Sequence, residues 1–196
     1  SSKRCVICSK TFRKFLPLEM YRSHFTSALE VIGSDLENFN CPFCGAIDRT
    51  RHLFLYFENL NLWGKMVNSR ILHLAAEKEL SKKIHRLNVK EYIKGDLKPM
   101  TSDTVKVDIT AIQYSNNYFD IIICNHVLEH VLEYEKAIKE IFRVLKKGGI
   151  AIVQTPFSKK IKKHFSDPYI KSNEDRALYY GTSDHVRVFG SELFNN

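Results

Sequence analysis

Three features are absent from this sequence, and each absence excludes a class of protein. No run of eighteen or more apolar residues occurs, which excludes a predicted transmembrane helix. Residues 1–13 are polar and basic, without the apolar centre of a signal peptide. No internal repeat or low-complexity segment interrupts the chain. We therefore expect a cytoplasmic protein with no membrane span.

The length of 196 residues and the hydrophobic content of 44% provide for one well-packed core with a small appendage, but hardly for two full domains. The chain begins with Ser1 and Ser2 rather than Met, and it ends at Asn196 just after an apparent helix start. From this ending we expect the catalytic domain to be incomplete at its C-terminus.

The net charge of +8 raises the question of an anionic partner. Basic residues exceed acidic ones only slightly in each part of the chain, so the excess is spread thinly. A single basic run stands out, which consists of Lys159, Lys160, Lys162 and Lys163. Such a run is usually a solvated helix or loop, and a role in binding nucleic acid is the alternative.

A strand, helix and strand pattern extends from residue 118 to residue 153. The apolar run 119–123 stops at Asn125 and His126, after which the apolar spacing becomes helical. The apolar helix positions are Ala137, Ile138, Ile141, Phe142 and Leu145. Gly148 and Gly149 are predicted to close the helix before the strand 150–153, which makes a βαβ unit with parallel strands. Ligands of such sheets bind at the carboxyl ends of the strands, so Asn125 and His126 should face a site.

Further elements are expected before this unit. Strands are predicted over 70–75, 91–94 and 105–108, a helix over 78–87, and a bridging helix over 53–60. The predicted fold class is α/β, with a Rossmann-like, mostly parallel sheet that carries helices on both faces and follows a small four-cysteine module. We place the module at residues 1–60 and the catalytic domain at 61–196, with the boundary in 61–69.

The N-terminal module is predicted from two cysteine pairs with metal-ligand spacing. The pairs are Cys5 with Cys8 and Cys41 with Cys44. Residues 15–39 must form an insertion between them, predicted to be helical over 20–32. Two disulfides are the alternative, and His24 is an alternative ligand, but an intracellular chain favours structural zinc. Because four cysteine ligands leave no open position, the metal would hold the fold and do no chemistry.

Three segments resemble class I S-adenosylmethionine-dependent methyltransferases of the small-molecule, type 11-like kind. They are 108–112, 118–131 and 142–149, within a resemblance that covers residues 71 to about 157. Residues 184–190 resemble a motif of a subgroup often found among bacterial surface-polysaccharide genes, in which a cysteine-rich segment precedes the methyltransferase domain. The resemblance implies S-adenosylmethionine as cofactor and a small-molecule acceptor, such as a carbohydrate.

The loop after the first strand departs from the family pattern. The resemblance puts Ala75, Glu77 and Glu79 where glycines are usual, and His73 where an acid is usual. Glycine there lets the backbone approach the ligand closely. A carboxylate at Glu77 would nonetheless attract the sulfonium and ammonium of the cofactor and repel the pyrophosphate of NAD. We predict cofactor contacts at His73, Ala75 and Glu77, and the alternative is that Glu77 caps the following helix.

The remaining cofactor contacts are predicted at other strand ends. Asp96 matches the family's acid that accepts hydrogen bonds from the ribose hydroxyls. Asp108 and Ile109 match the residues near the adenine amino group, and Asn125 and His126 complete the set. Cys124, at the end of an apolar strand, is predicted to be a buried core thiol.

Methyl transfer needs a positioned acceptor and, for an alcohol, a base. We predict catalytic roles for His126 and His185 as bases and for Arg187 in orienting an anionic acceptor, because 184–190 should wall the substrate pocket. Loop anchoring is the alternative for His185 and Arg187, and packing or capping is expected of His130. The predicted function is methyl transfer to a small hydroxyl or amine acceptor, such as a surface-polysaccharide sugar. An RNA methyltransferase and a catalytically inactive binding module are the alternatives.

Overall fold

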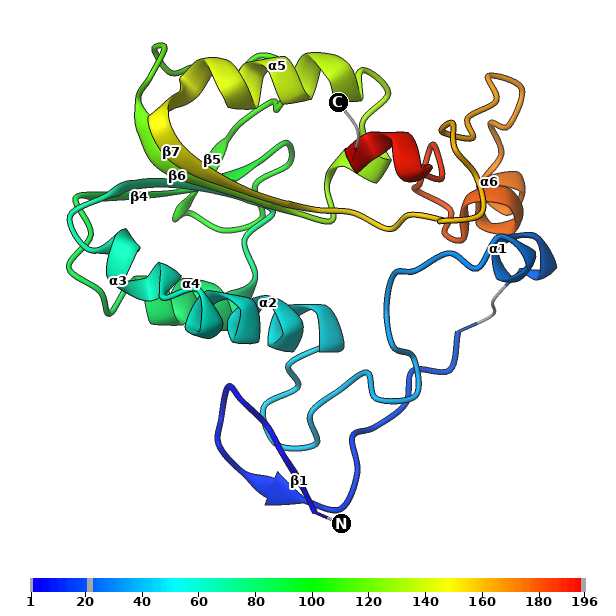
Figure 1. Ribbon diagram of the computed structural model, residues 1–196, viewed down its shortest axis with the longest axis horizontal. Coiled ribbons are helices and arrows are strands. Elements are labelled where there is room, and N and C mark those ends of the chain that lie inside the picture. Colours follow the sequence, from blue (N-terminus) through cyan, green and yellow to red (C-terminus); the bar gives the residue numbers. More distant parts are fainter. Residues whose placement is uncertain (1, 21–22, 195–196) are drawn as a thin grey trace.

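The central strands bury both of their faces, as the continuous apolar runs in the sequence require. The computed structural model describes residues 2–20 and 23–194, and it contains a five-stranded parallel sheet with the order β5-β4-β3-β6-β7. Its strands are β3 (Arg70–Leu74), β4 (Glu91–Asp96), β5 (Thr104–Lys106), β6 (Phe119–Asn125) and β7 (Leu145–Gln154). Helices lie on both sides of the sheet (Figure 1). The predicted fold class is confirmed.

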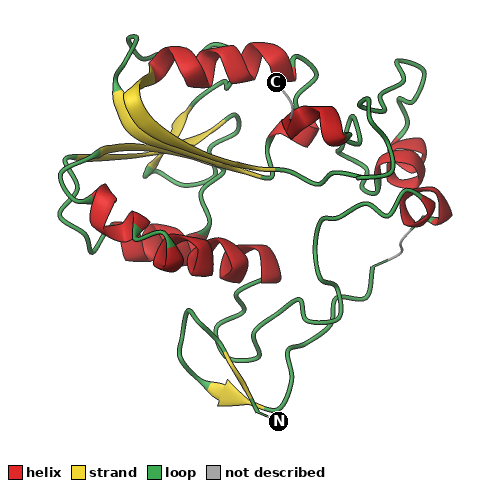
Figure 2. Cartoon of the chain, in the orientation of Figure 1, coloured by secondary structure: helices red, strands yellow, loops and turns green. Residues whose placement is uncertain are grey.

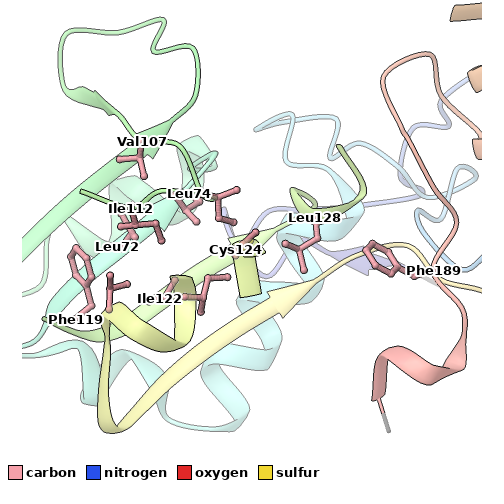
Figure 3. Packing of buried hydrophobic residues seen from close by; sticks show 13 residues of the cluster. Leu72, Leu74, Val107, Ile112, Phe119, Ile122, Cys124, Leu128 and Phe189 are labelled. Carbon is pink, nitrogen blue, oxygen red and sulfur yellow. The ribbon is translucent and has the colours of Figure 1, made fainter. Parts of the chain in front are cut away.

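Alternate residues of the strands enter two separate cores. Leu72, Ile122 and Cys124 pack on the side of α5 (Tyr134–Val144), together with Phe189 from near the C-terminus (Figure 3). Ile71, Ile121 and Ile123 pack on the opposite side. There they meet α2 (Asp48–Asn59), α3 (Leu62–Met66) and α4 (Lys78–Ile84). Cys124 is fully buried, as predicted, and burial raises the pKa of its thiol.

The N-terminal part of the chain contains little regular structure (Figure 2). Its hairpin pairs β1 (Lys3–Arg4) with β2 (Thr11–Phe12) beside the cysteines. The buried guanidinium of Arg51, from α2, donates to the carbonyl groups of Asn38, Phe39 and Ala46. This arginine therefore fastens the module to the helix that the sequence predicted as a bridge.

The helix predicted over 20–32 is much shorter in the structure. α1 (His24–Ala28) starts where the hydroxyl of Ser23 accepts a hydrogen bond from the N–H of Thr26. It ends at Leu29, and Glu30 has a φ of 48°, which an α-helix does not allow. Residues 21 and 22 of the prediction lie outside the described residues, as does the chain end at Asn196. α1 packs beside α6 (Asn173–Tyr180) (Figure 1).

One further prediction differs from the observed elements. Gly148 and Gly149 do not close α5, because the helix ends at Val144 and β7 begins at Leu145. The glycines instead form an irregularity in the pairing of β7 with β6, where Gly148 has a φ of 76°. Residues 61–69 contain α3, whose Trp63 and Met66 are buried in the same core as the sheet. The domain division at residue 60 stays a prediction.

None of the helices in the described ranges combines the length and the apolar character needed to cross a lipid bilayer.

Candidate functional site

The carboxyl ends of the three central strands meet along one edge of the sheet. β3 pairs with β4 and β6 in parallel, so Glu77, Asp96 and Asn125 all follow or end strands at this edge. Ala75 continues the pairing, since its N–H donates to the carbonyl of Gly95 at 2.9 Å. Its φ of 48° is the left-handed conformation that glycine adopts most easily. The loop therefore keeps a glycine-like backbone without a glycine.

His73, Glu77 and Asn125 form one hydrogen-bonded group behind this edge. The fully buried imidazole of His73 lies 2.8 Å from Glu77 Oε2 through Nε2 and 2.9 Å from the Tyr92 hydroxyl through Nδ1. The side-chain amide of Asn125 donates to Glu77 Oε1. Burial opposes ionisation of Glu77, but the hydrogen bonds from His73 and Asn125 hold the pKa of its carboxyl below the usual range. Glu77 is thus held as an anion at the strand ends.

Asn125 also carries an unsatisfied acceptor. Its Oδ1 is buried and has no hydrogen-bond partner among the described residues. A buried acceptor without a donor is costly, which marks the position where a ligand N–H or hydroxyl can bind. Next to the anionic Glu77, this acceptor suits the cationic ammonium of S-adenosylmethionine. These hydrogen-bond acceptors therefore fit the predicted cofactor.

Asp96 ends β4, as predicted, and Asp108 follows the neighbouring β5, which ends at Lys106 rather than at residue 108. Asp96 Oδ1 accepts a hydrogen bond from the N–H of Lys98 at 2.8 Å. Asp108 Oδ1 accepts from the N–H and hydroxyl of Thr110, and these hydrogen bonds lower the pKa of the Asp108 carboxyl. Both carboxylates are partly exposed, whereas Ile109 is buried. The predicted contacts of Asp96, Asp108 and Ile109 with a cofactor stay predictions.

His126 lies directly after Asn125 and is held by a buried carboxylate. Its backbone has a φ of 53°, and its Nδ1 is 2.9 Å from Glu129 Oε1. Glu129 is 1% exposed, and its other oxygen accepts a hydrogen bond from the Thr155 hydroxyl at 2.9 Å. Burial opposes ionisation, but the hydrogen bond from His126 lowers the pKa of the Glu129 carboxyl. The Nε2 of His126 is buried and unpartnered in the described part of the chain.

His185 and His130 come together from distant parts of the sequence. Their rings are in edge-to-face contact, with centroids 4.8 Å apart. His130 lies in the short 3-10 helix η1 (Leu128–His130) and contacts Asp184, and its ring packs against His185 rather than along the face of a longer helix. Burial lowers the pKa of the His185 imidazole, which is therefore neutral at neutral pH.

Arg187 is turned away from any open space. Its guanidinium donates to the carbonyl groups of Val131 and Leu132 at 2.7 Å each and stacks on the ring of Tyr134. These contacts anchor the segment 184–190 to the loop after η1. The predicted role of Arg187 in orienting an acceptor stays a prediction.

A cavity of about 610 Å³ opens beside the two catalytic candidates His126 and His185. The N-terminal insertion supplies one wall, through residues between Leu18 and Phe39, and the region around α6 supplies another. Polar groups such as Thr26, Glu30 and Thr182 are among its lining. A second cavity of about 680 Å³ also reaches His126, and it is lined by side chains from α5, β7 and the C-terminal segment. Of these two cavities, only the first is lined by both His126 and His185, so it is the candidate acceptor cavity.

The lysine run predicted as a possible anionic contact is exposed in the structure. Within it, Lys160 pairs with Glu30 at 2.8 Å, at the border of the first cavity. Binding of nucleic acid by this run stays a prediction.

The four N-terminal cysteines converge as their spacing predicted. All four thiols are free, with Cys5 Sγ 3.8 Å from Cys44 Sγ and Cys8 Sγ 3.8 Å from Cys41 Sγ. A tetrahedral metal with bonds of about 2.3 Å to sulfur has sulfur atoms about 3.8 Å apart. Burial opposes ionisation, but backbone N–H groups of Cys44 and Phe43 lower the pKa of the Cys41 thiol to about 7. The donor set fits a tetrahedral thiophilic ion, and His24 is not part of the cluster.

Sequence reasoning missed Glu129, Thr155 and the contact of His130 with Asp184. The spacing His126, Glu129, His130 is a signal that could have drawn attention to the carboxylate, because these types recur in metal and acid–base sites. No local signal links this group to His185, which is 55 positions from His130 in the sequence.

Comparisons with known proteins agree with this architecture. Residues 59–153 match a sequence family described as a methyltransferase domain. Over 65 residues the chain is 40% identical to the ubiquinone/menaquinone biosynthesis C-methyltransferase UbiE of Yersinia enterocolitica, and likewise to that of Yersinia pestis. The matched stretch is 33% of this chain, and the chain spans about a quarter (26%) of these relatives.

A solved structure supports the fold over a longer range. The YcgJ protein of Bacillus subtilis aligns with a TM-score of 0.50 and 17% sequence identity, over 71% of this chain and 65% of that chain. At this level of identity the likeness concerns the fold alone. The identity of the acceptor must therefore be argued from the site.

Proposed function

We propose that the chain is a class I S-adenosylmethionine-dependent methyltransferase, which transfers a methyl group to a hydroxyl or amine of a small polar acceptor. The acceptor class we favour is a sugar, such as one of a surface polysaccharide. The observation that carries this proposal is the position of His126. It directly follows Asn125 at the proposed cofactor edge, and it lines the first cavity together with His185.

The cofactor is proposed to bind along the ends of β3, β4 and β6. Glu77 and Asn125 Oδ1 offer acceptors for its ammonium group, and Asp96 offers acceptors for the ribose hydroxyls. When bound, S-adenosylmethionine supplies an electrophilic methyl group on a positively charged sulfur. Ala75 keeps the backbone turn that lets this loop approach a ligand.

His126 is proposed to accept the proton of the acceptor hydroxyl. The carboxylate of Glu129 receives the hydrogen bond of Nδ1–H, which leaves the lone pair on Nε2. Once Nε2 is protonated, the same buried carboxylate stabilises the imidazolium, as in other histidine–carboxylate pairs. His185 would act in the same cavity, where its neutral ring can bind a hydroxyl.

Zinc is proposed for the N-terminal cysteines, with a structural role. Its residues would be Cys5, Cys8, Cys41 and Cys44, whose sulfur separations fit a tetrahedron. Through the insertion between the pairs, the same module lines the acceptor cavity. We infer that the module contributes to acceptor choice by shaping that wall.

The cofactor half of the proposal is tested by calorimetric titration with S-adenosylhomocysteine. Micromolar affinity is expected, and Asp96→Ala should weaken binding by about 1.5–3 kcal/mol through loss of a charged hydrogen-bond partner. Asp103→Ala is the matched control, since its carboxylate follows the same strand but pairs with Lys94 outside the predicted set. Absence of binding by the parent would favour the inactive-module alternative.

The acceptor half is tested with radiolabelled S-adenosylmethionine and separate panels of nucleotide sugars, free sugars and short RNAs. Label in the sugar panels supports the proposal. Label only in RNA, with an affinity that falls steeply as salt rises, would replace it with the nucleic-acid alternative.

A further inference from the structure

We propose that Glu129, His130 and His185 bind a divalent metal ion at the wall of the acceptor cavity, where the ion holds oxygen atoms of the acceptor. The role toward the acceptor rests on the function proposed above. Binding of the ion itself does not, because it follows from the three side chains alone.

The three side chains already converge. One ligand atom from each lies within 4.8 Å of the other two. A metal ion with bonds of about 2.1 Å keeps neighbouring ligand atoms roughly 3–4 Å apart, so a shift of about 1 Å closes the site. The side chain of His130 is 35% exposed, so it has room to move toward the other two.

Both imidazoles are oriented as metal-binding histidines usually are. His185 Nδ1 lies 3.2 Å from the carbonyl of Tyr180, and His130 Nδ1 lies 3.2 Å from the carbonyl of Asp184. A carbonyl oxygen accepts only, so each Nδ1 must carry the proton and each Nε2 the lone pair. Metal-ligating histidines are commonly fixed in this way by a hydrogen bond from the other ring nitrogen.

Glu129 can bind the ion while it keeps its present partners. Its oxygens accept hydrogen bonds from His126 Nδ1 and from the Thr155 hydroxyl, both at 2.9 Å. Each carboxylate oxygen has two lone-pair positions, so one remains on each. The buried carboxylate also supplies the negative charge that a divalent ion requires at a site shielded from water.

Two imidazoles and one carboxylate define the chemistry of the site. This set suits zinc, manganese, iron or cobalt in the divalent state, and three protein ligands leave positions open for other oxygens. Because His185 lines the first cavity together with Thr182, we place the open positions toward that cavity. The cysteine set is different in kind, because its four sulfurs close the coordination.

An acceptor hydroxyl on such an ion would lie near His126. The unpartnered Nε2 of His126 is a buried acceptor on the side chain that shares Glu129 with the proposed site. A metal-bound hydroxyl loses its proton more easily, because the ion stabilises the alkoxide. The metal and the base would therefore act on the same oxygen.

The test is a manganese titration of the full chain, followed by electron paramagnetic resonance of free Mn²⁺. One equivalent of zinc is added first, because thiolates select zinc over manganese and this fills the cysteine set. The parent should then bind about one Mn²⁺ per chain. Glu129→Gln, His130→Ala and His185→Ala should each weaken this binding at least about tenfold, while His52→Ala, which changes an exposed histidine of α2, should not.

The same samples are titrated with S-adenosylhomocysteine, which separates the two proposals. Absence of manganese binding by the parent, with cofactor binding intact, overturns the metal site and leaves the proposed function standing. Manganese binding by the parent without cofactor binding overturns the proposed function and leaves the metal site standing. Should Glu129→Gln fail to fold, His130→Ala still decides, because its side chain is at the surface: unchanged manganese affinity in this variant overturns the ligand set.

Discussion

The described part of the chain contains two candidate sets of metal ligands, and they differ in what holds them in position. The cysteine set lies in a module whose buried hydrophobic cluster consists of Cys5, Cys41 and Ala46, so two of its three members are the ligands themselves. Glu129, His130 and His185 lie at the edge of a sheet with two extensive cores. A region without a core depends on its metal to fold, whereas a region with a core can place ligands before any metal arrives.

The largest effect that separates the two sets is expected at the cysteines. Cys41→Ser should abolish the binding of about one zinc per chain and unfold the N-terminal module, since structural zinc contributes binding free energies of about 10–16 kcal/mol. Elemental analysis measures the zinc, and hydrogen exchange measures the loss of protection before α2. The sheet should keep its protection.

Cys124→Ala is the matched control for this change. Cys124 is a buried thiol of the sheet core outside the cluster, so zinc content should stay at about one per chain despite a modest loss of packing. Zinc-free protein with two disulfides would contradict the assignment of the cysteine set as a metal site.

The two sets also differ in how far the sequence could predict them. Cys5 with Cys8 and Cys41 with Cys44 are local pairs, and their spacing is typical of metal ligands. His130 meets Asp184, 54 positions later, only because residues 184–190 return to η1, where the N–H of Val186 donates to the carbonyl of Glu129. Contacts that form because a distant segment folds back produce no periodic pattern or characteristic spacing in the sequence.

The same distinction applies to the fold. β6 was predictable because its apolar run is continuous, whereas the cofactor contacts of Asp96, Asp108 and Asn125 at the strand ends stay predictions. The helix predicted over 20–32 failed, since the capping hydroxyl of Ser23 and the left-handed Glu30 limit it to α1. The hydrogen bonds that hold Glu77 as an anion were also unpredictable, because its partner Asn125 comes from another strand.

A smaller effect is expected at Glu77, which the scaffold holds without a metal. Its folded pKa lies below its unfolded value, so its contribution to stability is present above the unfolded pKa and is lost as pH falls through the folded pKa. Glu77→Gln should therefore cost about 1–2 kcal/mol of unfolding free energy at pH 7, and less as the pH falls below about 4. Urea unfolding at several pH values measures this, with Glu79→Gln in the same turn as control.

The pH profile sharpens the comparison when it is repeated on the zinc-free protein. The difference between the parent and Glu77→Gln should not depend on zinc, because the partners of Glu77 are His73 and Asn125 in the sheet. A difference that disappears on chelation would mean that the module supports the strand ends, and the two regions would then fold as one unit.

The smallest effect is expected at His130 in protein that contains zinc but no second metal. His130→Ala removes a hydrogen bond to the Asp184 carbonyl and a contact with the Asp184 carboxylate, which is 70% exposed, and such surface interactions contribute little. The unfolding free energy should fall by no more than about 1 kcal/mol, since neither His130 nor Asp184 belongs to a hydrophobic core. Denaturant unfolding with and without Mn²⁺ measures this: the parent should gain stability from the ion and the variant should not, because only a state that binds the ion is stabilised by it. A loss of several kcal/mol without any added ion would instead put His130 with the cysteines, as a residue that the fold itself requires.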